Sequence, residues 1–136
     1  MKIIDASVAF KWFIPEVTSP QALALLDGEG RFHAPELILT EVANAMWVRL
    51  RNQGEGQAAV VAHATRALQD ILDRLVPPAD LLPRAIDLAF ALRHPVYDCV
   101  YLALAEREGV SLVTADNRLI EAAQAGGLES LVEALA

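Results

Sequence analysis

Cysteine is nearly absent from this chain, since Cys99 is the single one among 136 residues. That count excludes an internal disulfide and a cysteine-based zinc site. Long apolar runs are also missing, although 54% of the residues are hydrophobic. No uninterrupted apolar run in the chain approaches the ~20 residues that a membrane-spanning helix needs. Residues 1–4 are too short for a signal peptide, so we expect a cytoplasmic protein with one domain, residues 1–136.

Basic residues are scarce too, with 11 lysines and arginines against 18 aspartates and glutamates and a net charge of −7. Non-specific binding to nucleic acids normally requires a broad basic surface, so a protein that binds nucleic acids non-specifically is disfavoured. Any nucleic acid is expected to be held locally, at a metal site with a few arginines. The high hydrophobic content without a membrane segment predicts that some apolar surface faces a partner or a second copy of the chain.

Short apolar strands and longer helical patterns alternate along the chain. Strands are predicted at residues 2–5, 31–34 and 110–114, and residues 128–132 suit either an edge strand or a helical tail. Helical spacing and capping residues predict helices over residues 8–13 with Ser7 as the cap, 19–27, 39–53, 61–75, 82–93, 96–108 and 118–124. This alternation indicates an α/β protein, with a central, mainly parallel sheet flanked by helices.

Four acidic residues stand where such a fold would gather them into one pocket. Asp5 and Asp116 follow predicted strands, and parallel sheets bind ligands beyond the carboxyl ends of their strands. Glu41 and Asp98 lie in apolar helical patterns. Burying several carboxylates together is very costly unless a cation neutralises them, and oxygen ligands suit Mg²⁺ or Mn²⁺. Alternatively, Asp116 is a simple helix cap and Asp98 a favourable charge in a first helical turn.

A metal site of this kind suits the hydrolysis of phosphodiester bonds, because carboxylate-held ions can activate water and stabilise the leaving oxygen. Ser7, Thr114 and Asn117 are candidates to hold ligands or waters around it, although each also fits an ordinary cap or strand position. Arg118 is the best-placed arginine for a phosphate, and Trp12, beside Lys11, could line a substrate path. Three histidines are scattered along the chain: His33, His63 and His94. None of them is expected to have a second metal ligand at helical spacing.

Four segments of the chain together match a family pattern. They read IDASV at residues 4–8, EVANA at 41–45, YDCVYLALA at 97–105 and LVTADNRL at 112–119. In this order, with Lys11 and Trp12 after the first, they resemble PIN-domain proteins of the VapC toxin type over essentially the whole chain. The resemblance implies a PIN-like fold and a Mg²⁺- or Mn²⁺-dependent ribonuclease toxin of a bacterial or archaeal toxin–antitoxin pair. It also implies a homodimer and a small cognate antitoxin that inhibits the enzyme.

By this resemblance, the metal ligands and catalytic residues are an acidic quartet: Asp5, Glu41, Asp98 and Asp116. Residues expected to support the quartet are Ser7, Asn44, Thr114 and Asn117, and the candidates for RNA contact are Lys11 and Arg118. Cys99 departs from the pattern, because many relatives have alanine there, but its small side chain should not disturb the site. Residues 54–95 match only as a helical pattern, so the sequence does not identify the RNA.

Two other phosphate-handling folds fit less well. A receiver domain of a response regulator needs a lysine on a late strand, and the only lysines are Lys2 and Lys11. A phosphatase with an Asp-x-Asp pair fails because Asp5 is followed by Ala6 and Ser7. The alternative that stays open is a catalytically silent PIN-like binding or scaffold module, although such a module has no need for four clustered acids.

Overall fold

One parallel sheet organises the protein. In the computed structural model, which describes residues 1–136, five strands follow the order β3-β2-β1-β4-β5, and every neighbouring pair is parallel. The strands are β1 (Lys2–Ile4), β2 (Phe32–Pro35), β3 (Arg74–Val76), β4 (Leu112–Thr114) and β5 (Val132–Ala134). β1 is central, and its Ile3 pairs with His33 on one side and Leu112 on the other. The strand order reverses between β1 and β4, and ligands of α/β proteins bind at such a switch point.

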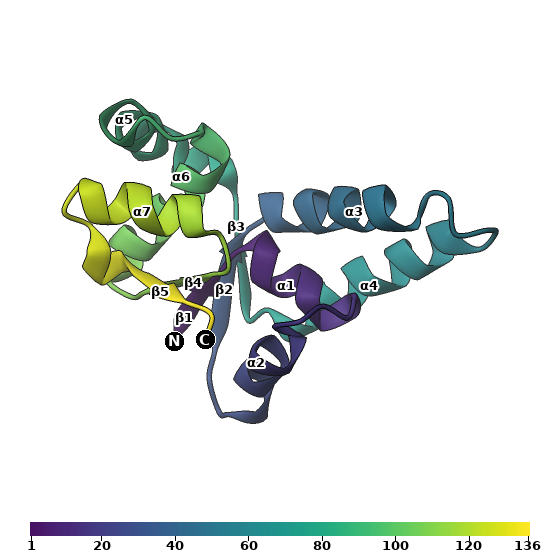
Figure 1. Ribbon diagram of the computed structural model, residues 1–136. Helices are drawn as coiled ribbons and strands as arrows, with labels where there is room; N and C mark the ends of the chain where they lie inside the picture. The colour runs from purple at the N-terminus through teal and green to yellow at the C-terminus, as the bar shows by residue number, and fades with distance from the viewer.

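Helices cover both faces of this sheet, which Figure 1 shows nearly edge-on. One face carries α1 (Ala6–Phe13), α2 (Ser19–Ala24), α3 (Leu37–Leu50) and α4 (Gln57–Ile71), and the other carries α5 (Leu82–Leu92), α6 (Val96–Glu108) and α7 (Asn117–Ala125). Single 3₁₀ turns are η1 (Leu25–Asp27), η2 (Pro78–Asp80) and η3 (Glu129–Leu131). The predicted fold class, a parallel α/β sheet flanked by helices, is confirmed.

The most buried helix is α6, which places two of the site residues. Its residues 99–105 are all buried, because α6 packs between α5 and strands β1 and β2. A helix that is apolar all round belongs in a protein interior. α6 therefore forms the centre of a continuous core of 29 buried residues that reaches from β1 to α7. None of the helices has the length and apolar character required to cross a membrane.

The prediction of one helix over residues 61–75 is wrong at its end. α4 stops at Ile71, Leu72 is extended, and Arg74–Val76 form β3 alongside β2. The apolar residues that fit helical spacing also fit a half-buried strand. The free edge of β2 favours the strand here, because pairing with residues 74–76 satisfies the backbone hydrogen-bonding groups of β2. Next to this pair, the Asp73 carboxylate accepts the Phe32 N–H at 2.9 Å. Of the two possibilities left open for residues 128–132, an edge strand is present, but it lies later than predicted: Glu129–Leu131 form the turn η3, and β5 begins at Val132.

Leu102→Ala should destabilise the protein by about 2–5 kcal/mol, because Leu102 is fully buried in α6 and its truncation leaves a cavity. Urea unfolding followed by circular dichroism measures this. Leu82→Ala is the control, because Leu82 is 38% exposed on α5 and should cost much less. Equal losses for the two variants would contradict the core assignment.

Candidate functional site

Asp5 lies at the carboxyl end of the central strand and is only 5% exposed. Its Oδ1 accepts hydrogen bonds from the Ser7 hydroxyl at 2.6 Å and from the Val8 N–H at 3.1 Å, and its Oδ2 accepts one from the Thr114 hydroxyl. Asp5 is therefore the N-cap of α1, and the prediction that Ser7 fills this position is wrong. An aspartate one residue after the strand reaches the first free N–H groups of the helix equally well, which leaves Ser7 to hold the carboxylate.

The same hydroxyls connect β1 to the loop after β4. The Ser7 hydroxyl accepts the Ala115 N–H at 3.0 Å, and the Thr114 hydroxyl accepts the Asp116 N–H at 3.0 Å. Asp116 in turn caps α7, with its Oδ1 accepting the Arg118 N–H at 2.9 Å. The two strand ends on either side of the switch point thus hold each other in a fixed geometry.

Asp98 lies beside Asp116 and contacts a histidine. His94 Nε2 is 2.6 Å from Asp98 Oδ2, and His94, Asp98 and Asp116 each offer one ligand atom within 4.8 Å of the others. The expectation that no histidine has a partner at metal-ligand spacing is therefore wrong for His94, which precedes Asp98 by four residues. The four-residue spacing of His94 and Asp98 was a signal in the sequence. It was not used, because Pro95 indicates a break between two helices and so places the two residues outside one regular helix.

Glu41 projects from α3 towards the interior and meets α6. Tyr101, 1% exposed, donates its hydroxyl hydrogen to Glu41 Oε1 at 2.6 Å. Sequence reasoning did not single out Tyr101, although its position three residues after Asp98 on one helix was a signal that the two share a face. A buried tyrosine hydroxyl needs a partner, and this one fixes the carboxylate of Glu41.

Asp98 influences the charges of the other three acids or is influenced by them. The pKa of Asp5 is raised from 3.8 to about 6, chiefly by burial and to a smaller extent by the Asp98 charge, against the lowering effect of its hydrogen bonds. Burial and then the Asp98 charge also raise the pKa of Glu41, which the Tyr101 hydroxyl lowers. The pKa of Asp98 itself is raised by burial and by Asp116, and lowered by His94. Crowded carboxylates of this kind favour a bound cation, which would relieve their repulsion.

A pocket of about 460 Å³ opens beside Glu41 and Ser7, with Lys11 and Glu16 on its wall. The Lys11 ammonium lies 3.0 Å from the Glu16 carboxylate, which also accepts a hydrogen bond from Arg49 at 2.9 Å. The pocket therefore carries one positive group, Lys11, next to the acids, although Glu16 partly neutralises it in the free protein. A larger pocket of about 630 Å³ lies between α3 and α4.

The remaining predicted residues lie further out. Asn44 is exposed on α3, one turn after Glu41, and Asn117 and Arg118 are exposed at the start of α7. Their expected roles in supporting the acids or contacting RNA stay predictions.

The sequence profile of the PIN domain family matches residues 2–125. The chain belongs to the PIN domain family. This PIN domain is 31% identical to ribonuclease VapC3 of Pyrobaculum aerophilum over 88% of the chain and 92% of the relative. It is 34% identical to ribonuclease VapC9 of Mycobacterium tuberculosis over 92% and 93%.

Solved structures agree on the fold of this PIN domain. PAE2754 of Pyrobaculum aerophilum superposes with a TM-score of 0.72 at 21% identity, covering 98% of this chain and 88% of the other. VapC20 of Mycobacterium tuberculosis, described as a toxin that cleaves the sarcin–ricin loop, gives 0.69 at 18% identity, covering 90% and 95%. At these identities the likeness establishes the architecture alone.

The donor atoms of this PIN domain fit a divalent cation. Two carboxylates and an imidazole converge within 4.8 Å, and the neighbouring acids Asp5 and Glu41 add negative charge to the same region. Carboxylate oxygens suit Mg²⁺ and Mn²⁺, and imidazole nitrogen suits transition metals.

Asp5→Asn should stabilise the metal-free protein at pH 7.5. The folded protein binds the Asp5 proton more tightly than the unfolded chain, because the pKa rises from 3.8 to about 6 on folding. The stability that this proton contributes, about 3 kcal/mol, is present below pH 3.8 and is lost as pH rises through 6. Asparagine keeps the size of the side chain and removes this pH dependence.

Urea unfolding between pH 4 and pH 8, with chelator present, measures the effect. The advantage of Asp5→Asn over the wild type should grow through this range, whereas Asp80→Asn at an exposed position should show no such trend. A difference that stays constant with pH would contradict the assigned burial of the Asp5 charge.

Proposed function

We propose that this PIN domain is a metal-dependent endoribonuclease, the toxin of a toxin–antitoxin pair, which hydrolyses RNA phosphodiester bonds in the cytoplasm as a single domain. The observation that carries the proposal is the crowding of Asp5, Glu41 and Asp116 around Asp98 in a member of this family. Relatives named ribonucleases over about nine-tenths of both chains support it. The second candidate is a silent binding module, which the cost of crowding four acids disfavours.

Each acid has a role in this proposal. Asp98 and Asp116 hold the divalent ion, and Asp5, locked by Ser7 and Thr114, keeps the carboxyl edge in place and adds charge. Glu41 receives the Tyr101 hydrogen bond on Oε1, which leaves Oε2 to take a proton from the attacking water. The ion, when bound, lowers the pKa of water and stabilises the charge that develops on the phosphate.

The RNA backbone is proposed to enter through the pocket that joins Glu41 to Lys11. Lys11 is mostly buried and held by Glu16, so its ammonium is oriented before RNA arrives. Arg118 stands exposed at the start of α7, where its guanidinium is accessible to a phosphate. RNA contacts from only a few basic side chains near the pocket are consistent with the net charge of −7, which does not favour binding along an extended stretch of RNA.

RNA cleavage should fall by orders of magnitude in Asp5→Asn with either Mg²⁺ or Mn²⁺ present, although the variant folds. Purified proteins are incubated with total RNA, and new RNA 5′ ends are mapped by sequencing. Asp80→Asn is the matched control, because it removes one exposed carboxylate and should cleave like the wild type. A wild type that produces no metal-dependent ends would favour the silent binding module, and an Asp5→Asn protein with full activity would remove Asp5 from the site.

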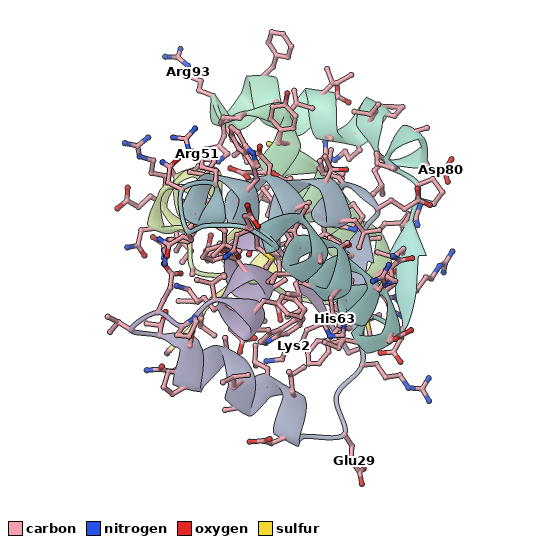
Figure 2. The ribbon with its side chains drawn as sticks, turned by 90° about the vertical axis from the view of Figure 1, so that its right-hand side faces the viewer. Lys2, Glu29, Arg51, His63, Asp80 and Arg93 are labelled. Carbon is pink, nitrogen blue, oxygen red and sulfur yellow. The ribbon has the colours of Figure 1, made fainter.

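The partners are proposed to occupy two different surfaces. The groove between α3 and α4, lined by Trp47, Val61 and Ala58 among others, would accept an apolar segment of the antitoxin. Figure 2 views the molecule from this side, with Arg51 labelled just after the end of α3 and His63 labelled on α4. The outer face of α5 exposes Ile86 at 44% and Phe90 at 83%, which suits a homodimer contact. A basic side chain of the antitoxin could then reach the acids and stand in for metal charge, an arginine best of all.

Ala58→Arg should weaken antitoxin binding by at least tenfold, because it puts a charge in the α3–α4 groove without disturbing the core. Ala59→Arg adds the same charge at the next position, which is exposed and outside the groove, and should bind normally. Calorimetric titration with the product of the adjacent small gene measures both, and sedimentation checks that each variant remains a dimer. Equal affinities for the two variants would rule out this groove.

A further inference from the structure

His94 is held firmly in the site by the turn between α5 and α6. Arg93 ends α5 in a left-handed conformation with φ of 53°, and the His94 N–H then donates to the Ala89 carbonyl at 3.1 Å. The Cys99 thiol lies 3.8 Å from the His94 carbonyl oxygen. This turn buries the imidazole, of which 10% is exposed, against the start of α6.

The spacing of the donor atoms is close to that of ligands sharing one ion. In octahedral coordination at about 2.1 Å, adjacent donors lie about 3 Å apart and opposite donors about 4.2 Å apart. His94 Nε2 and Asp98 Oδ2 are 2.6 Å apart, and the Asp116 oxygen lies within 4.8 Å of both donor atoms. Only a small outward movement of the His94–Asp98 pair is needed for both atoms to face one cation. With its proton on Nδ1, the imidazole presents a lone pair at Nε2.

We propose that His94 is a direct ligand of the metal ion and makes the site select first-row transition-metal ions over Mg²⁺. This inference rests on the proposed metal-dependent function and narrows the identity of its ion. Mg²⁺ prefers oxygen ligands and retains its waters, whereas imidazole nitrogen binds transition metals well. The affinity of one nitrogen–oxygen site rises from Mn²⁺ to Co²⁺, so these two ions serve as graded probes.

A different role for His94 would be to orient Asp98 by a hydrogen bond, without touching the ion. Ligands oriented in this way commonly lose 10- to 100-fold in metal affinity when the orienting group is removed, on the order of the effect of a lost ligand. The two roles differ in selectivity. A misplaced Asp98 weakens the binding of every divalent ion alike, whereas a missing nitrogen ligand weakens transition metals and leaves Mg²⁺ nearly unchanged.

The metal-free wild type, His94→Gln and His63→Gln are titrated with Mg²⁺, Mn²⁺ and Co²⁺ by calorimetry, without RNA. His63 is exposed on α4 and serves as the matched control. The wild type and the control should bind Mn²⁺ and Co²⁺ at least about tenfold more tightly than Mg²⁺. His94→Gln should lose about 10- to 100-fold for Co²⁺ and Mn²⁺ and less than about threefold for Mg²⁺.

Pulsed electron paramagnetic resonance of Mn²⁺ bound to the wild type gives a readout that does not depend on the variant folding. It should detect the coupling of a directly bound ¹⁴N nucleus, which His63→Gln retains and His94→Gln lacks. Equal losses for all three ions, no preference in the wild type, or no nitrogen coupling would each overturn the inference. A wild type that cleaves RNA with Mg²⁺ but shows no nitrogen coupling would overturn this inference alone. A wild type that binds no divalent ion would overturn the proposed function as well.

Discussion

The burial of neighbouring carboxylates at the carboxyl edge of the sheet is the constraint on which the site depends. Asp5 is almost fully buried at the switch point between β1 and β4, and its pKa is raised to about 6 because burial opposes its charge. Asp98, next to Asp116, raises the pKa of Asp5 and Glu41 in turn. This crowding gives the protein no stability of its own, and a bound cation would relieve it.

Neutral donors hold these charges in place. Ser7 and Thr114 hold Asp5 while their oxygens accept N–H groups after β4, and Tyr101 holds Glu41 from the middle of α6. The Thr114–Asp5, Ala115–Ser7 and Tyr101–Glu41 contacts each join elements that are distant in the sequence, so these acids cannot move apart without breaking the packing. This is why the most buried helix, α6, also carries Asp98: a rigid core fixes the position of a functional group better than a loop does.

The two faces of the sheet serve different purposes. α6 is enclosed between the sheet and α5, which gives the site its rigid wall. On the opposite face, α3 and α4 extend away from the sheet as a hairpin, as Figure 1 shows, and leave an apolar groove between them. Glu41 sits near the start of α3, where the hairpin meets the sheet. A partner bound along the hairpin therefore lies within reach of the acids, which gives the proposed inhibition a simple geometric basis.

The sequence by itself determined the parallel α/β class and the order of most elements, because hydrophobic periodicity is a local signal. It also singled out four acids, whose roles in the site stay a prediction. It missed β3, because the spacing of its apolar residues suits a helix as well as a strand and only the free edge of β2 selects the strand. It also missed the contacts of His94 and Tyr101 with the acids, and assigned the cap of α1 to Ser7 instead of Asp5. These features depend on which side chains meet between different helices and strands. Only the tertiary structure decided them, because the packing of the chain sets distances between residues that no local sequence pattern connects.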